Sequence, residues 1–305
     1  MTASHRDRRS GQPVFRFAPS PTGTLHIGHA YSALLNERLA RETGGRLLLR
    51  IEDTDTTRCR PQFEASIIAD LDWLGIAFDE PPRRQSDHFP LYDKAARTLR
   101  QKRLLYPCFA SRSEIAEAVA HIEATGEAWP RDPDGSPHYP GIWRDAPDGE
   151  VAGRIAAGEP HAWRIDMARA LDGVSVDDLA YEEFPDETAT RTTRVSRDPS
   201  VWGDFVIVRK DAPASFHLAG VVDEDVQGVT DVVRGQDLAQ ATGLHRLLQH
   251  HLGLVPPRYR HHRLIAGEDG EKLSKSRGSL ALAALREAGE SARDIRARLG
   301  FAQAG

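Results

Sequence analysis

The start of the chain holds the pattern that most constrains the fold: a strand, a turn, a helix and a second strand in direct succession. Residues 14–17 form a short apolar run, which the segment 19–23, rich in proline, interrupts. Apolar residues at helical spacing follow over 27–43, and a Gly-Gly pair ends that helix before a second apolar run at 47–51. A βαβ unit has this order, so the sequence predicts an α/β fold with a doubly wound parallel sheet.

The same patterns predict further elements along the chain. Helices are expected over 61–75, 90–104 and 238–252, closing helices over 280–285 and 292–299, and strands at 204–208, 219–223 and 264–265. The stretches 126–149 and 182–199 lack apolar periodicity, so both are predicted to be loops, the second a mobile one.

Composition excludes several classes of protein. The formal net charge of −5 excludes a surface that is basic throughout but leaves room for a local basic groove. The two cysteines, Cys59 and Cys108, match no disulfide framework and indicate a reducing cytoplasm. The polar N-terminus is unlike a secretory signal, and no apolar run is long enough to cross a membrane, so no membrane partner is expected.

The segment His26-Ile-Gly-His29 directly follows the predicted strand-to-helix turn. Ligands bind at this edge of doubly wound sheets, beside helix N-termini that favour anions. Two histidines at this spacing share one helix face and can donate hydrogen bonds to phosphate oxygens, while Gly28 leaves room for a flat ring or a close backbone approach. A solvated surface pair and a metal-binding pair are the alternatives.

The segment Lys272-Leu-Ser-Lys-Ser276 lies on a predicted loop bounded by glycines. If such a loop closes over a triphosphate, Lys272 and Lys275 can stabilise the departing pyrophosphate by their positive charge. In isolation, a solvated basic loop is the commoner meaning of this string.

Together and in this order, the two motifs resemble the HIGH and KMSKS signatures of class I aminoacyl-tRNA synthetases. Within that class, the segments that begin at Arg16 (RFAPSPTG), Arg50 (RIEDTD) and Val232 (VVRG) resemble the glutamyl branch, and the resemblance covers nearly all of residues 13–280. It implies a Rossmann-like catalytic core that activates glutamate with ATP and Mg²⁺ to glutamyl-adenylate.

The resemblance also implies roles for individual residues. The implied catalytic residues are His26, His29, Lys272 and Lys275, the implied ATP contacts are His26, Gly28, His29 and Lys275, and the implied glutamate pocket is Arg16, Ser20, Glu52, Phe216 and Arg234. Arginine suits the carboxylates because its planar fork gives bidentate hydrogen bonds, and Glu52 would hold the α-ammonium. A glutamine-specific pocket is the alternative, which the two arginines disfavour.

The expected organisation follows the family. It is a disordered tail over 1–12, the first half of the core over 13–105, an inserted α/β subdomain with the mobile loop over 106–203, the second half of the core over 204–260, and the KLSKS loop with a short helical C-terminal stem over 261–305.

The chain ends soon after Ser276, without the anticodon-binding region of a full glutamyl-tRNA synthetase. This matches short members of the branch that resemble the catalytic body alone. They activate glutamate without tRNA and transfer it to the queuosine base in the anticodon of tRNA(Asp), so the anticodon stem-loop of that tRNA is the implied partner, and a monomer is expected. The alternatives are a truncated synthetase that charges the 3′ end of tRNA(Glu) and a catalytically inactive, synthetase-like RNA-binding protein.

The chain departs from the family at its zinc positions. The family's inserted segment often carries Cys-x-Cys and Tyr-x-x-x-Cys, and the equivalent positions here read Cys108, Ala110, Tyr139 and Trp143. One cysteine and one tyrosine cannot form a tetrahedral structural site. No zinc is therefore expected, and Trp143 is expected to fill the space by apolar packing.

A second departure concerns the aromatic and histidine residues near the implied pocket. Phe216 stands where the family usually has Tyr, and it is either a core aromatic or a pocket wall without a hydroxyl. If this stretch is a strand, His217 points to the opposite face. Five further histidines are expected to be solvated or to face RNA rather than to bind metal: His245, His250, His251, His261 and His262.

Overall fold

The computed structural model describes residues 11–265 and 281–301. Its strands are β1 (Val14–Phe17), β2 (Arg46–Ile51), β3 (Arg83–Arg84), β4 (Leu105–Cys108), β5 (Ala162–Ile165), β6 (Tyr181–Phe184), β7 (Thr193–Val195), β8 (Val206–Val208), β9 (Asp231–Gly235) and β10 (Arg258–His262). Its α-helices are α2 (Ile27–Glu42), α3 (Pro61–Trp73), α4 (Phe89–Gln101), α5 (Arg112–Glu123), α6 (Asp148–Ala156), α7 (Met167–Leu171), α8 (Phe216–Val226), α9 (Ala241–Leu252), α10 (Leu282–Glu287) and α11 (Ala292–Arg298). The predicted tail, apart from its last residues, and the KLSKS segment lie outside the described residues.

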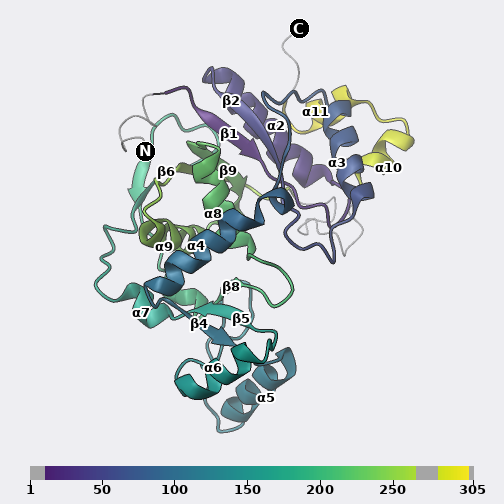
Figure 1. Ribbon diagram of the computed structural model, residues 1–305. Helices are drawn as coiled ribbons and strands as arrows, with labels where there is room; N and C mark the ends of the chain where they lie inside the picture. The colour runs from purple at the N-terminus through teal and green to yellow at the C-terminus, as the bar shows by residue number, and fades with distance from the viewer. Residues whose placement is uncertain (1–10, 266–280, 302–305) are drawn as a thin grey trace.

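The larger of the two sheets has the strand order β3-β2-β1-β9-β10-β6-β7. All its neighbouring strands run parallel except β6 and β7, which are antiparallel. The chain moves from β1 through α2 to β2 on one side, whereas β9 and β10 lie on the other side of β1 (Figure 1). The predicted doubly wound parallel sheet is confirmed, and its strand order reverses between β1 and β9.

The core beside β1 and β2 is built by apolar residues at the predicted helical spacing. Leu34 and Leu35 on α2 pack with Leu47 and Leu49 on β2 in one buried cluster. The C-terminal helices α10 and α11 complete this cluster and lie next to α3 (Figure 1). They therefore close the sheet-and-helix layer that carries the first strands.

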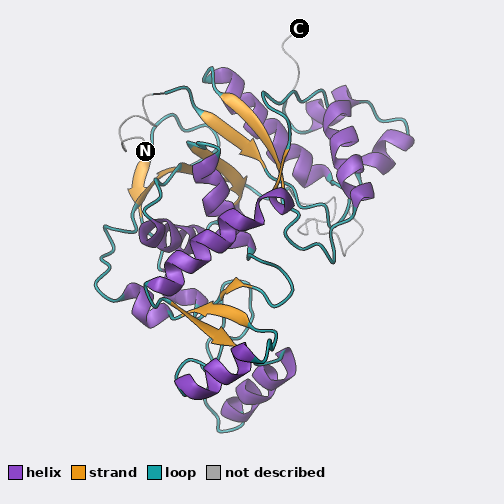
Figure 2. Cartoon of the chain, in the orientation of Figure 1, coloured by secondary structure: helices purple, strands orange, loops and turns teal. Residues whose placement is uncertain are grey.

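The smaller sheet has the order β4-β5-β8 and is antiparallel. It lies at the opposite end of the molecule from α10 and α11, with α5 and α6 beyond it (Figures 1 and 2). The strand expected at 204–208 forms as β8 but pairs in this sheet, not in the larger one. The domain limits expected from the sequence stay a prediction.

Two expectations about local structure are wrong. The stretch 182–199 is not all loop, because β6 and β7 pair there and β6 extends the parallel sheet beside β10. The strand expected at 264–265 lies earlier, at Arg258–His262. Tyr259 is the one side chain of that strand that is neither an arginine nor a histidine, so the strand has no apolar pattern although it is largely buried.

The strand expected at 219–223 is also wrong, because this stretch is the middle of helix α8. The Ser215 hydroxyl caps the helix by accepting a hydrogen bond from the backbone N–H of Leu218 at 3.3 Å. The valines that suggest a strand are buried with residues of α4 and α9. Burial on several faces removes the polar side that normally identifies a helix in sequence.

Asp223 on α8 joins the helical layer to the edge of the larger sheet. Its carboxylate is fully buried and accepts hydrogen bonds from Arg83 (2.9 and 3.0 Å), Gln85 (2.9 Å) and the Tyr92 hydroxyl (2.7 Å). Burial, followed by the charge of Asp223, raises the pKa of Tyr92, so this phenol stays a donor. One carboxylate therefore fixes α8 against β3 and α4.

Replacing Asp223 by Ala is expected to lower the free energy of unfolding by about 3–5 kcal/mol, because the guanidinium of Arg83 loses its buried partner. Chemical denaturation with urea measures the change. Asp177→Ala is the control, since that side chain is 91% exposed and its ion pair with Arg194 lies at the surface. Equal stability of the two variants would contradict the role assigned to Asp223.

Among the described residues, no helix is both long enough and apolar enough to cross a membrane.

Candidate active site

A cavity of about 480 Å³ opens where β1 and β9 end, beside the first turn of α2 and one face of α8. This is the carboxyl edge of the parallel strands at the point where their order reverses, the usual ligand position in such sheets. The predicted site residues that line it are Arg16, Ser20, His26, Gly28, His29, Glu52, Phe216 and Arg234. Lys272 and Lys275 lie outside the described residues.

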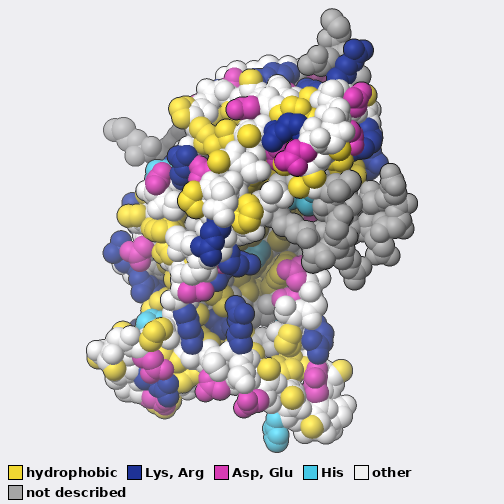
Figure 3. Space-filling model, turned by 90° about the vertical axis from the view of Figure 1, so that its right-hand side faces the viewer, with side chains coloured by type: hydrophobic (Ala, Val, Ile, Leu, Met, Phe, Trp, Pro, Cys, Tyr) yellow, Lys and Arg dark blue, Asp and Glu magenta, His cyan; other side chains and the backbone are white. Residues whose placement is uncertain are grey.

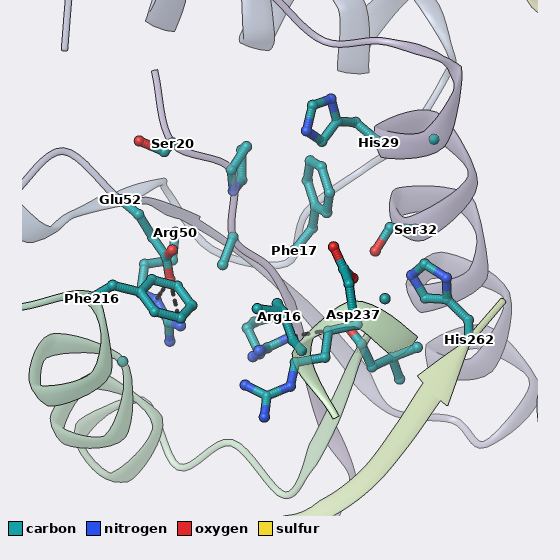
Figure 4. A pocket seen from close by; sticks show the side chains of 18 of the residues that line it. Arg16, Phe17, Ser20, His29, Ser32, Arg50, Glu52, Phe216, Asp237 and His262 are labelled. Atoms are coloured by element: carbon teal, nitrogen blue, oxygen red, sulfur yellow. Dashed lines mark hydrogen bonds and ion pairs between the residues drawn. The ribbon is translucent and has the colours of Figure 1, made fainter. Parts of the chain in front are cut away.

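The floor of the cavity is a cluster of buried charges. Arg16 forms an ion pair with Glu224 at 3.3 Å, and Arg50 forms one with Glu52 at 3.0 Å. Figure 4 shows Arg16 at the centre of the cavity, with Arg50 and Glu52 beside it. Arg234 is the third buried cation of the floor, and within the described chain it forms no ion pair with a carboxylate. The floor therefore carries one more cation than anion.

The Arg16–Glu224 pair is incompletely satisfied. Arg16 Nε and Glu224 Oε2 are buried and have no hydrogen-bond partner within the described structure. Burial lowers the pKa of Arg16 to about 10, the charge of Glu224 opposes this, and the nearby charges of Arg50 and Arg234 add to it. Buried polar groups are normally paired, so these atoms indicate that a polar ligand completes the floor.

Glu52 is suited to bind a cationic group. It follows β2 directly, and its backbone N–H donates to the carbonyl of Pro19 at 2.9 Å, which holds it beside the β1–α2 turn. Burial raises the pKa of Glu52, and the charges of Arg50 and Arg16 oppose this rise. An ammonium ligand would stabilise the charged carboxylate further.

Arg234 is held by neutral side chains. Its guanidinium donates to Thr242 Oγ1 at 2.8 Å, to His245 Nδ1 at 3.2 Å and to His261 Nε2 at 3.4 Å. Burial and then the charge of Arg234 lower the pKa of His245 well below its ordinary value, and burial lowers the pKa of His261 to about 4. Both rings are therefore neutral near pH 7.

His26 and His29 form a reciprocal cap at the start of α2. The backbone N–H of Gly28 donates to His26 Nδ1 and that of His26 donates to His29 Nδ1, each at 3.1 Å. The two rings stack with their centroids 3.7 Å apart. Because each Nδ1 accepts, the proton of each neutral ring lies on Nε2. A Cβ at Gly28 would lie 3.1 Å from the His26 ring and crowd this cap.

Phe216 is a wall of the cavity and not a core aromatic. Its side chain is 39% exposed, at the first turn of α8, and its ring lies beside the Arg50–Glu52 pair in Figure 4. His217 points away from the cavity, as expected, but within a helix and not a strand. Its Nδ1 lies 3.1 Å from His245 Nε2, and burial lowers its pKa to about 4.

Glu224 lines the cavity but is not among the site residues predicted from the sequence. Phe216, Gly220 and Glu224 all line the cavity, at the regular four-residue spacing of one helix face. Reading 219–223 as a strand hid this face. The spacing from Phe216 was the signal that could have revealed it.

Three further lining residues, Ser32, Asp237 and His262, were not predicted as site residues. Asp237 and His262 lie close to Ser32 on the α2 side of the cavity (Figure 4). Asp237 follows β9 and His262 ends β10, so the sheet brings them to the same edge as Arg234. The segments that carry the family resemblance end at Gly235 and begin again at Lys272, so neither residue lies within a motif.

The expected exposure of the histidine-rich stretch is partly wrong. His245 and His262 are buried, and the side chain of His261 is 4% exposed. They lie on α9 and β10, the elements packed next to Arg234, so their function is local. His250 is exposed and His251 half-buried, with His251 Nε2 2.7 Å from the carbonyl oxygen of Ala170.

The four family zinc positions do converge in this fold, but their chemistry does not suit zinc. Cys108, Ala110 and Tyr139 form a buried cluster against which Trp143 packs. The Tyr139 hydroxyl accepts from the Trp143 backbone N–H at 2.9 Å, and the guanidinium of Arg164 lies 4.1 Å from the Tyr139 ring centroid. A single thiol beside a cation does not fit a structural zinc ion. The absence of zinc stays a prediction.

The described residues on either side of the segment 266–280 lie at or next to the cavity. Ile265, the last described residue before it, lines the cavity. Ala281, the first described residue after it, forms a β-bridge with His26, and the Leu282 N–H donates to the Leu25 carbonyl at 2.9 Å.

The family model for the catalytic domain of class I tRNA synthetases specific for glutamate and glutamine (E and Q) matches residues 14–299. The chain belongs to this family. It is accordingly a ligase of the kind that forms an aminoacyl-adenylate, and the HIGH and KMSKS resemblance is explained.

Relatives in the family carry two kinds of name. The chain is 42% identical over 296 residues to the glutamyl-Q tRNA(Asp) synthetase of Rhodobacter capsulatus, covering 94% of this chain and 100% of that protein. It is 37% identical to glutamate–tRNA ligase 2 of Nitrosococcus oceani, covering 93% of this chain but 58% of that protein. Among solved structures, the glutamate tRNA ligase of Elizabethkingia meningosepticum in complex with its amino acid matches with a TM-score of 0.75 and 26% identity, over 95% of this chain and 61% of that one.

The variant His26→Asn tests whether His26 takes part in the chemistry or only caps helix α2. Asparagine is as good an N-cap as any residue, so thermal unfolding should change little, whereas the loss of the Nε2–H donor should lower the rate of ATP–pyrophosphate exchange about 100-fold. The control is His88→Asn, which changes the residue before α4, where no side-chain cap exists. An exchange rate within about threefold of wild type for His26→Asn would contradict a role of His26 in the chemistry.

Proposed function

We propose that the chain activates glutamate with ATP, without requiring tRNA, and transfers it to the queuosine base in the anticodon of tRNA(Asp). The observation that carries the first half is the charged floor of the cavity. Glutamate has two carboxylates and one ammonium, and the floor offers Arg16, Arg50 and Arg234 against Glu52 and Glu224. A ligand with two carboxylates and one ammonium matches these floor charges group by group, and Asp237 lies apart from them on the α2 side of the cavity.

The chemistry needs positioning and charge stabilisation more than a protein nucleophile. An oxygen of the glutamate α-carboxylate attacks the α-phosphorus of ATP, and the bond from that phosphorus to the bridging oxygen breaks. Pyrophosphate leaves and glutamyl-adenylate forms. Arg16 and Arg234 hold carboxylate oxygens, Glu52 holds the ammonium and Ser20 contacts the substrate.

ATP is assigned to the α2 side of the cavity. The neutral rings of His26 and His29 carry their protons on Nε2, which suits donation to phosphate oxygens, and Gly28 lets the nucleotide approach the backbone. Mg²⁺ is expected to accompany the phosphates as part of the substrate. Lys272 and Lys275 are assigned to the pyrophosphate by their place in the family motif.

In the second step, a hydroxyl of queuosine attacks the carbonyl carbon of glutamyl-adenylate, and AMP leaves as the new ester forms. The name of the R. capsulatus relative supports this acceptor. In Figure 3, Lys and Arg side chains gather along one side of a mid-height hollow and below it, with Asp and Glu side chains on its other side, so one border offers local positive charge to an RNA backbone on a protein of negative net charge. We further propose that the enzyme acts in the cytoplasm as a monomer.

A second candidate is charging of the 3′ end of tRNA(Glu), which the names of the N. oceani relative and of the E. meningosepticum structure favour. The two candidates share the adenylate and differ only in the acceptor.

The deciding experiment has two stages. Glutamate-dependent ATP–pyrophosphate exchange is measured without tRNA, and transfer of labelled glutamate is then measured to tRNA(Asp) with and without queuosine and to tRNA(Glu). We expect exchange without tRNA, and label only on queuosine-containing tRNA(Asp), retained when the 3′-terminal adenosine of that tRNA is removed beforehand. Label on the 3′ end of tRNA(Glu) would overturn the acceptor. No exchange at all would favour an inactive RNA-binding protein.

Phe216→Tyr tests the position of glutamate in the cavity. The new hydroxyl would restore one hydrogen bond at the wall beside Arg50 and Glu52, so the KM for glutamate in the exchange assay should fall by about 2- to 10-fold, corresponding to about 0.5–1.5 kcal/mol. The KM for ATP should not change. Phe89→Tyr, which adds a hydroxyl away from the cavity, is the matched control. An unchanged KM for glutamate would place the amino acid elsewhere.

A further inference from the structure

Arg234 is held in place by acceptors that do not neutralise it. A guanidinium has five N–H bonds, and Thr242, His245 and His261 each accept one of those of Arg234. Nη1 and Nη2 each keep a second N–H with no acceptor among the described residues. A carboxylate that enters the cavity can accept both, in the bidentate geometry that arginine favours.

The acceptor role of His261 depends on a second residue. His261 Nδ1 lies 2.5 Å from Glu183 Oε1, and because a carboxylate only accepts, the ring proton must lie on Nδ1. Nε2 therefore keeps its lone pair toward Arg234 Nε at 3.4 Å and Thr242 Oγ1 at 3.0 Å. With the other tautomer, an N–H on His261 would face an N–H on Arg234.

The sheet fixes the geometry of this arrangement. His261 on β10 is the register partner of Arg234 on β9, and Glu183 on β6 pairs with Tyr259, two residues before His261 on the same strand face. Arg197 donates to both oxygens of Glu183, at 2.8 and 3.1 Å, and so holds the carboxylate from behind. Three adjacent parallel strands thus place Glu183, His261 and Arg234 in line.

We propose that Glu183 and His261 are positioning residues that hold Arg234 for a substrate carboxylate and make the cavity select glutamate over glutamine. This inference rests on the proposed function, because it assigns the specificity of the same pocket. Neither residue is a lining residue of the cavity, and both act through Arg234.

The expected selectivity has a physical reason: the carboxylate of Glu183 does not contact Arg234 directly, because the ring of His261 lies between them. A carboxylate in direct contact with Arg234 would compete with the substrate, whereas a neutral imidazole orients the guanidinium and leaves its charge available. A glutamate carboxylate satisfies both remaining N–H groups. The carboxamide of glutamine offers one oxygen and turns its NH₂ group toward a donor, and an unpaired buried donor is strongly disfavoured.

The kinetic test uses Glu183→Gln and His261→Phe in the exchange assay. Both variants should raise the KM for glutamate about tenfold or more, while the KM for ATP and kcat stay within about twofold of wild type. Both should also lower the ratio of kcat/KM for glutamate to kcat/KM for glutamine. His261→Gln, whose amide oxygen can accept from Arg234, should recover part of the affinity. The matched controls are Glu182→Gln, next to Glu183 but hydrogen-bonded to Thr192 instead, and His250→Gln, which is exposed.

A spectroscopic readout separates positioning from a general structural role. Long-range ¹H–¹⁵N NMR of the histidine rings should show His261, assigned by its loss in His261→Gln, as the Nδ1–H tautomer in wild type. In Glu183→Gln, the Nε2–H tautomer should appear, because the amide no longer requires a donor.

The outcomes of these measurements distinguish failure of the proposed function from failure of the positioning role. If the wild type shows no glutamate-dependent exchange, the proposed function fails, and the NMR tautomer still decides the geometry behind Arg234. If the wild type is active, an unchanged KM for glutamate and unchanged preference in both variants overturn the inference, as does an Nε2–H tautomer in wild type. A loss confined to kcat, or an equal rise in both KM values, also overturns it.

Discussion

The parallel pairing of β1 with β2 on one side and β9 on the other is the constraint on which the site depends. Parallel strands end at one edge of a sheet, so Arg16, Glu52 and Arg234 converge there from segments far apart in the chain. Because the strand order reverses at β1, the helices that follow the strands diverge and leave a crevice. The start of α2 borders that crevice, which places a helix N-terminus beside the charged floor.

Burial of charge gives this site its function at a cost in stability. Arg16, Arg50 and Arg234 are almost fully buried, and together they exceed the carboxylates of Glu52 and Glu224. Such an arrangement is unfavourable when empty, because desolvated like charges repel. The surrounding structure compensates with well-packed layers and with paired buried charges such as Asp223 and Arg83, so that a ligand of complementary charge supplies the missing interaction.

The small antiparallel sheet shows how the fold joins parts of the chain that the sequence presents as separate. Residues after β5 return to the larger sheet as β6 and β7 before β8 rejoins β5. Strand β6 then lies beside β10. This places Glu183 next to His261, which contacts Arg234. The polar stretch over 182–199 carries no periodicity to indicate this, because its pairing partners lie far away in sequence.

The sequence by itself determined the parallel α/β core and the positions of the two signature motifs, because local apolar periodicity and short motifs encode them directly, and the family resemblance pointed to several residues that line the cavity. It could not determine that 219–223 is helical, since burial on several sides leaves no polar face, and so Glu224 was missed. It also misplaced His245, His261 and His262 at the surface, because imidazoles are equally common in water and in buried hydrogen-bond networks. Which of these applies is decided by the neighbours that β9, β10 and α9 bring together, and only the tertiary structure sets those contacts.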